Sequence, residues 1–277
     1  VFIDEFKECI FRLRDYFNNE QQTENLADLS NAYTIRMVTC SNDAIKLCDC
    51  ILDIRDKYDS TIDKDEIGGP NDRYELLAKR LVVVSRLCLD FILEDMMKYL
   101  DEKFFKILLT RDWLGNDKIM STIIETSNDY MNDLIRLRPE SQLEILYKWH
   151  LRIKVEFLKG FMQNYSSMLR KCQFGEATER ALFYSKLNTE LNQLEAWFGR
   201  VTAKLTDSVV AEFELLRLMG KIVKAEDVDF MGVEVAALIR RCPDINSDML
   251  FALISLRGDV SRSDFKEVSK AKHSYKF

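Results

Sequence analysis

The two histidines are the first candidates for chemistry, because an imidazole can act as a general base or as a metal ligand near neutral pH. They are His150 and His273. His150 lies on the apolar side of a helical pattern beside Trp149, so we interpret it as a core or interface residue. The sequence has no nucleophile elbow, no His-Glu-x-x-His motif and no Gly-rich phosphate loop. We therefore predict that the protein is not an enzyme and uses no cofactor and no metal.

Cysteines and clustered acids are the next candidates. Seven cysteines occur, mostly at apolar positions, which predicts buried reduced thiols in a cytosolic protein. Cys48 and Cys50 are two residues apart, a spacing that fits neither a redox pair nor a zinc site. Asp63, Asp65 and Glu66 lack the ligand spacing and the closing Glu of a calcium loop, so we interpret them as a solvated loop.

Basic residues gather at the end of the chain. The final 21 residues carry six basic and three acidic side chains. One interpretation is contact with anionic lipid head groups, and the other is an ordinary solvated tail. The tripeptide Arg257-Gly258-Asp259 is interpreted as a helix cap with flanking charges. The candidate lipid-contact residues are Arg257, Arg262, Lys266, Lys270, Lys272 and Lys276.

Composition limits the fold and function classes. The 277 residues include only 9 Gly and 3 Pro, too few turn residues for an all-β fold. With 31% charged and 47% hydrophobic residues the chain is typical of a globular protein, and its net charge of −6 does not favour nucleic acid. No transmembrane segment or signal peptide is predicted. The chain starts with Val1, from which we expect part of a longer protein.

Apolar residues recur at steps of three and four along almost the whole chain, which predicts helices, and no convincing alternating strand pattern occurs. Several of these helices should span about 25–35 residues, and long helices with short connections stack into antiparallel bundles. The predicted fold class is therefore all-α, an elongated rod of stacked antiparallel helical bundles. The expected helices cover residues 2–17, 26–58, 71–108, 118–137, 140–174, 177–198, 201–219, 233–239 and 247–256.

Glycine and proline mark the expected helix ends, at Pro139, Gly175, Gly199, Gly220 and Pro243. Pro139 also divides the charge. Residues before it carry 19 basic and 27 acidic side chains, whereas the rest carry 21 and 19. We therefore predict an N-terminal bundle over 1–138, a C-terminal bundle over 139–260 and a polar, basic tail over 261–277.

Four segments together resemble the family of exocyst complex component 3, the Sec-six subunit, and its tumour-necrosis-factor-induced and component-3-like relatives. Each segment is a helix fragment with a cap, and their order and spacing match the C-terminal region of that family over about residues 80–265. They are LCLDFILED at 87–95 running into LTRDWL at 109–114, IMSTIIETSNDY at 119–130, EFLKGFM at 156–162, and CPDI at 242–245 followed by LISLRGDVS at 253–261.

The resemblance implies a non-catalytic rod of a vesicle-tethering complex, with no catalytic residues to carry over. Such rods hold secretory vesicles at the plasma membrane before fusion, together with other exocyst subunits and SNARE machinery. The implied location is cytoplasmic and peripheral at the plasma membrane. Two alternatives remain open: a module that binds anionic lipids through the basic C-terminal segment, and a component-3-like adaptor for membrane protrusions.

Two groups of side chains are possible partner contacts. Asp95 interrupts an apolar stripe, so we expect it to face a partner or the solvent. Phe230, Met231, Tyr275 and Phe277 are weaker candidates for a partner surface, with ordinary packing as the alternative.

Overall fold

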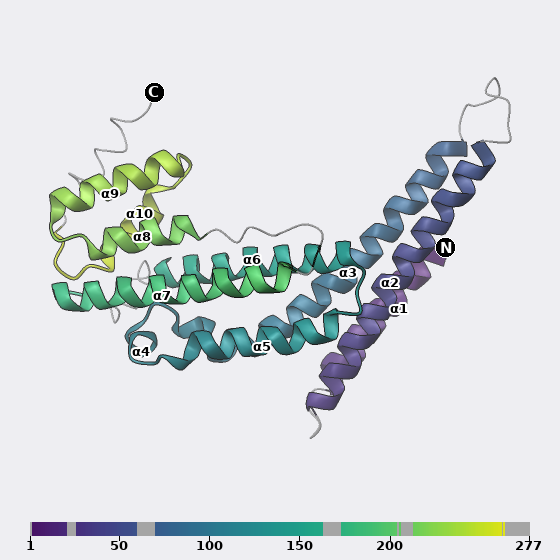
Figure 1. Cartoon of the computed structure of the whole chain (residues 1–277), viewed down its shortest axis with the longest axis horizontal. Helices are drawn as coiled ribbons and strands as arrows, with labels where there is room; N and C mark the ends of the chain where they lie inside the picture. Colours follow the sequence, from purple (N-terminus) through teal and green to yellow (C-terminus); the bar gives the residue numbers. More distant parts are fainter. Residues whose placement is uncertain are drawn as a thin grey trace. The chain divides into compact units, whose positions relative to one another are not determined.

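A computed structural model describes residues 2–20, 26–59, 70–162, 173–203 and 213–261, together with 205 and 263 (Figure 1). Across these residues the regular structure is helical, and no strand is formed. One isolated parallel bridge joins Phe174 to Arg257. The predicted all-α, helical-bundle class is confirmed.

The chain forms two compact units. Unit 1 consists of Val1–Tyr99 and Ser127–Ile145, and unit 2 of Leu100–Thr126 and Leu146–Phe277. Neither unit is continuous in sequence, so this partition differs from a single division after residue 138. Whether 1–138 and 139–260 fold as separate bundles stays a prediction.

Unit 1 is built around three long helices, α1 (Phe2–Glu20), α2 (Leu26–Asp59) and most of α3 (Pro70–Lys103). Helices α1 and α2 lie side by side (Figure 1), and Phe17 stacks on Tyr33 with ring centroids 4.2 Å apart. Between α2 and α3 the buried hydroxyls of Ser41 and Ser85 share a hydrogen bond of 2.8 Å. Apolar residues at steps of three and four therefore lie between the helices, as their spacing predicts.

The second part of unit 1 is a helix–turn–helix connection. Helix α5 (Lys118–Leu134) ends five residues before Pro139, and α6 (Pro139–Met162) begins at that proline. The expectation that Pro139 closes the preceding helix is therefore wrong. Proline suits the first helical position because that backbone position needs no N–H donor. The turn is held to α2 by Arg138, whose side chain pairs with Asp49 and whose N–H donates to Asn42 Oδ1 at 3.2 Å.

Unit 2 packs α6 and α7 (Ala177–Thr202) with three shorter helices, α8 (Glu214–Lys224), α9 (Val228–Arg241) and α10 (Ser247–Ser255). Two short elements precede them, the 3-10 helix η2 (Phe105–Ile107) and α4 (Arg111–Leu114). Trp113, Trp149 and Trp197 are at most 1% exposed and fill the core. Helix α8 lies between α7 and α9 within this unit (Figure 1).

Two expected glycine ends in unit 2 are wrong. Helix α7 passes through Gly199 to Thr202, and α8 passes through Gly220 to Lys224. At Gly220 the missing side chain serves packing, because a methyl group there would lie 2.6 Å from Leu187 Cδ2 on α7. Phe174, expected in a helix, instead forms the bridge with Arg257, and residues 163–172 lie outside the described part of the chain.

Candidate interaction surfaces

His150 belongs to the core of unit 2. It is 4% exposed and meets the rings of Phe198 and Phe213 edge-on, with centroids 5.4 and 5.0 Å away. The interpretation of His150 as a core residue is confirmed. Among the described residues no three His, Cys, Asp or Glu side chains are placed to hold a metal ion. The same residues include no helix long and apolar enough to cross a membrane.

The cysteines divide into buried and exposed thiols. Cys48 and Cys88 are buried, and burial raises the pKa of each thiol. Cys9 and Cys50 are exposed, so the expectation of mostly buried thiols holds for only part of the set. Cys9 and Cys50 lie on outward helix faces, because an apolar stripe covers only part of a helix's circumference. Cys172 lies outside the described residues, as do Asp63, Asp65 and Glu66.

Arg257 is buried, with a side chain 1% exposed. Its guanidinium donates to the carbonyl of Ala225 at 2.6 Å and pairs with the Asp259 carboxylate at 2.9 Å. A cation held inside the unit does not face a lipid surface, so the candidate role of Arg257 in lipid contact is corrected. Arg262, Lys266, Lys270, Lys272 and Lys276 lie outside the described residues, and their lipid contact stays a prediction.

The arginine belongs to a small ionic cluster that joins distant segments. Arg180 on α7 pairs with Asp259 at 3.1 Å and donates to the carbonyl of Gly175. The Phe174 N–H donates to the carbonyl of Leu256 at 2.8 Å. The tripeptide at 257–259 therefore connects the segment before α7 to the segment after α10. The sequence predicts a helix cap with flanking charges here, whereas in the structure Arg257 and Asp259 form ion pairs that link these segments.

Sequence reasoning missed a second buried charge, Glu190 on α7. It accepts a hydrogen bond from the indole of Trp113 at 2.8 Å, and burial raises its pKa to about 7. Lys186, one turn away, bridges to Asp117 at 2.7 Å. A signal was present in the sequence, since Glu190 lies three residues after Leu187 and four before Leu194, on the apolar stripe of this helix. The arrangement ties the loop before α5 to α7.

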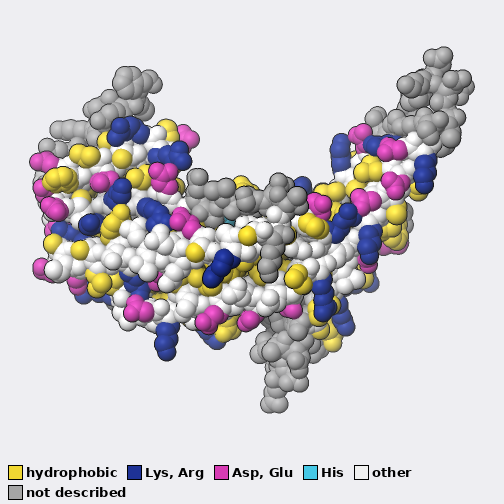
Figure 2. All heavy atoms as spheres, in the orientation of Figure 1, with side chains coloured by type: hydrophobic (Ala, Val, Ile, Leu, Met, Phe, Trp, Pro, Cys, Tyr) yellow, Lys and Arg dark blue, Asp and Glu magenta, His cyan; other side chains and the backbone are white. Residues whose placement is uncertain are grey.

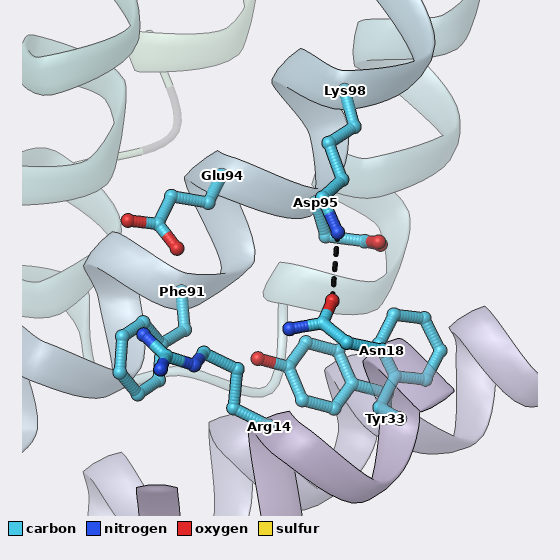
Figure 3. A pocket seen from close by; sticks show the side chains of 8 residues that line it. Arg14, Asn18, Tyr33, Phe91, Glu94, Asp95 and Lys98 are labelled. Carbon is cyan, nitrogen blue, oxygen red and sulfur yellow. Dashed lines mark hydrogen bonds between the residues drawn. The ribbon is translucent and has the colours of Figure 1, made fainter. Parts of the chain in front are cut away.

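A small pocket opens in unit 1 between α1, α2 and α3 (Figure 3). Its volume is about 70 Å³, well below what a small-molecule ligand needs. Arg14 lies over the ring of Phe91 at 4.7 Å, and Lys98 donates to Asn18 at 2.7 Å. These contacts occupy Arg14, Asn18 and Lys98, three of the polar side chains that line the pocket. We interpret the pocket as a packing defect between helices.

Asp95 lines this pocket but is only 7% exposed. Its carboxylate accepts a hydrogen bond from the Tyr130 hydroxyl on α5 at 2.9 Å. The expectation that Asp95 faces a partner or the solvent is therefore wrong. An acid within an apolar stripe can be satisfied inside a bundle when a neighbouring helix supplies a donor.

Apolar side chains also lie on outward helix faces. On α6, Tyr147, Leu151 and Val155 are 54%, 42% and 40% exposed. They are spaced four residues apart and therefore form one stripe about 12 Å long. The opposite side of α6 carries buried residues such as Trp149 and Ile153. Helix α6 thus has an apolar inner face and an apolar outer stripe.

Helix α9 shows a second outward group. Phe230 and Val233 are 59% and 63% exposed, whereas Met231 is fully buried. Of the four candidate partner-surface residues, the structure therefore exposes Phe230 and buries Met231. Tyr275 and Phe277 lie outside the described residues. Hydrophobic side chains are interspersed with both signs of charge on the face drawn in Figure 2, so no single-sign field dominates it.

Comparison with known proteins gives a consistent family. Residues 2–262 match the family model of "Exocyst complex component Sec6". Exocyst complex component 3 of Caenorhabditis elegans is 21% identical over 58% of this chain and 20% of its own length. Its Drosophila melanogaster counterpart is 22% identical over 71% and 26%. The human exocyst complex component 3-like protein is 25% identical over 70% and 25%.

Two solved structures share the fold. The C-terminal domain of the exocyst subunit Sec6p superposes with a TM-score of 0.66 at 14% identity, over 98% of this chain and 69% of that one. M-Sec superposes with a TM-score of 0.60 at 15% identity, over 97% and 42%.

The chain spans about a fifth to a quarter of the length of the three curated relatives. The four segments that carry the resemblance lie inside the matched residues, and the helical bundle agrees with the two neighbouring structures. This chain therefore belongs to the exocyst complex component Sec6 family.

Proposed function

We propose that the chain is a non-catalytic scaffold region of an exocyst subunit. It binds other exocyst subunits and SNARE proteins or their regulators, and helps to hold secretory vesicles at the plasma membrane before fusion. Its location is then cytoplasmic and peripheral at sites of secretion. The single observation that carries this proposal is the outward apolar stripe of α6, Tyr147, Leu151 and Val155.

Partner binding follows from the physics of that stripe. Burying one large apolar side chain against a partner contributes about 1.5–3 kcal/mol. The inner face of α6 is fixed by Trp149, Ile153 and Phe157, which are at most 1% exposed. The backbone that carries the outer side chains is therefore already ordered, so little conformational entropy of this surface is lost when a partner binds.

A copurification experiment tests the proposal. The full-length protein with an affinity tag is isolated from cells, and copurified exocyst subunits and SNARE proteins are measured by quantitative mass spectrometry. Leu151→Lys should lower partner recovery about tenfold, because it removes more than 1.4 kcal/mol of contact. Leu182→Lys is the matched control, since Leu182 on α7 is 56% exposed. Failure of the unchanged protein to recover any exocyst subunit contradicts the proposal.

The basic C-terminal segment carries a second candidate function, a contact with anionic membrane lipids. With Arg257 buried, five basic side chains remain in this role: Arg262, Lys266, Lys270, Lys272 and Lys276. Flotation with phosphoinositide liposomes should then depend on salt, because a Debye length of about 8 Å at physiological ionic strength screens such contacts. Unchanged liposome binding after all five residues are changed to Gln excludes the lipid role.

A component-3-like adaptor for membrane protrusions is the remaining alternative, and relatives of both names match this chain. Restored secretion after expression of the full-length protein in cells depleted of exocyst complex component 3 favours the subunit. Restored protrusions without restored secretion favours the adaptor.

A further inference from the structure

Two cysteine thiols lie in the same layer of the contact between α1 and α2. Both Cys9 on α1 and Cys40 on α2 are free, the first exposed and the second half-buried. The two helices run antiparallel (Figure 1), and the ring of Phe17 stacks on that of Tyr33. Because both helices rise equally per residue, counting back from Phe17 and forward from Tyr33 places Cys9 opposite Ser41, which directly follows Cys40.

On α2, Cys40 belongs to the seam that packs against α1. It lies seven residues, or two helical turns, after Tyr33, whose ring contacts α1. Ala44, one turn further along this seam, is fully buried. Cys40 itself packs against the hydrophobic core cluster of unit 1. Its side chain therefore lies on the side of α2 that faces α1.

On α1, Cys9 lies at the rim of the same contact. Phe6 and Leu13, three residues before it and four after it, pack against the same core cluster as Cys40. Burial raises the pKa of the Cys40 thiol, and the charge of the Cys9 thiolate raises that pKa further. Because the interaction of two charges weakens with distance, this effect agrees with the helix register in placing the two thiols near each other.

We propose that Cys9 and Cys40 are a site of oxidative modification, at which hydrogen peroxide produces a reversible disulfide that ties α1 to α2. The Cys9 thiolate attacks one peroxide oxygen, the O–O bond breaks, and Cys9 sulfenic acid and water are formed. The Cys40 sulfur then attacks the Cys9 sulfur, the S–O bond breaks, and the second water leaves with the Cys40 proton. Two thiols and one peroxide thus give one disulfide and two waters, and the sulfurs lose two electrons to the peroxide.

The two cysteines divide the roles that such a disulfide requires. The thiol that meets the oxidant must be open to solvent and must have a second thiol beside it. Cys9 is exposed, and Cys40 lies across the helix contact. Cys88 on α3 is fully buried, so it is shielded from the oxidant. Cys50 is exposed on the same helix as Cys40 but lies about 15 Å further along its axis, and it provides a control.

Peptide mapping tests the disulfide. Purified full-length protein is treated with hydrogen peroxide, the remaining thiols are blocked with N-ethylmaleimide, and an unreduced tryptic digest is analysed by mass spectrometry. Trypsin releases Cys9 on peptide 8–12 and Cys40 on peptide 37–46, each without a second cysteine. The expected result is a linked pair of these two peptides that increases with peroxide and disappears after treatment with dithiothreitol.

The same digest contains the outcomes that overturn the proposal. Absence of the linked pair overturns it, whichever other residues are oxidised. Cys9 recovered as sulfinic acid beside an unmodified Cys40 shows that the second thiol does not reach the first. A link from Cys40 to Cys88 in place of Cys9 shows that the wrong pair was chosen.

Hydrogen exchange measured by mass spectrometry tests whether the disulfide ties α1 to α2. Oxidation should slow exchange of the α1 amides of the wild type at least about tenfold, because local separation of α1 then requires opening of a closed loop. Cys9→Ser and Cys40→Ser should show no slowing, and Cys50→Ser should match the wild type. Equal slowing in Cys9→Ser, or unchanged exchange in wild type that carries the linked pair, overturns the tie.

Discussion

Glu190 shows how a single buried carboxyl makes stability depend on pH. Burial raises its pKa in the folded protein to about 7, from an ordinary value of 4.5. The folded state therefore prefers the protonated form. The contribution of Glu190 is fully present below its unfolded pKa and is lost as pH rises through about 7. The shift corresponds to at most about 3 kcal/mol.

We predict that Glu190→Gln flattens the pH dependence of the melting temperature between pH 5 and pH 8 and raises the melting temperature above pH 7. A glutamine oxygen can still accept from the Trp113 indole, so the fold is kept. Thermal unfolding monitored by circular dichroism measures this, with exposed Glu125→Gln as the control. Parallel pH profiles for wild type and Glu190→Gln would contradict the prediction.

We predict that Arg257 stabilises the folded protein. Arg257→Ala leaves Asp259 with one guanidinium partner fewer and removes the donor to the Ala225 carbonyl. Breaking such a buried pair costs about 3–5 kcal/mol. Arg240→Ala is the control, because Arg240 is exposed. Denaturant unfolding should separate the two variants, and liposome flotation should not. A drop in flotation with unchanged stability would restore Arg257 to the surface role.

At the scale of the helix, Gly220 sets the distance between α8 and α7. Gly→Ala gains about 1 kcal/mol of helix propensity in an open position. At Gly220 the added methyl group meets Leu187 and Tyr184 at 2.6 and 3.1 Å, so we predict net destabilisation of about 1–3 kcal/mol.

Gly199 in α7 and Gly232 in α9 are matched controls, because a methyl group at either position would meet no atom within 4 Å. Both Gly→Ala changes should raise the free energy of unfolding. Urea titration of the three variants gives the comparison, and stabilisation by Gly220→Ala would show that α8 can move away from α7 without cost.

Helix ends explain most of what the sequence could not predict. The seams follow from spacing alone, which predicts α2 and α10 almost to the residue, whereas α9 begins at Val228, five residues before its expected start. Pro139 and Gly220 were interpreted as breakers, although one is a first helical residue and the other a contact point. Their roles depend on neighbours that are distant in sequence. Phe230 and Met231 make the same point: both are apolar neighbours on α9, yet one is exposed and the other buried.

For the whole chain, the composition of the two units predicts how a truncated protein behaves. A chain ending at residue 138 keeps Trp113 but loses Phe183, whose ring lies 5.4 Å from the indole, and also loses Glu190. We predict that 1–138 melts at a lower temperature than the intact chain and binds the dye ANS, because core surface is exposed. Cooperative unfolding of 1–138 and 139–277 at the melting temperature of the intact chain would support two independent bundles instead.

Residues 100–126 show why a single division was predicted. Charge and proline are read along the chain, whereas a compact unit is a property of contacts in space. This stretch precedes Pro139, yet its Trp113 and Asp117 contact Glu190 and Lys186 on α7. The four family segments were found because they are local in sequence. The ionic cluster of Arg180, Arg257 and Asp259 was missed because its members are distant.

The hydroxyl pair of Ser41 and Ser85 has a mechanical consequence. Sliding α2 along α3 by one turn would separate the two oxygens and leave both without a partner among apolar neighbours, at about 1–3 kcal/mol for each group. Apolar seams alone resist such sliding weakly, since one leucine replaces another at nearly equal energy. The pair therefore fixes the register of the hairpin, so that a pull along the helix axes is resisted as a shear load rather than absorbed by slippage.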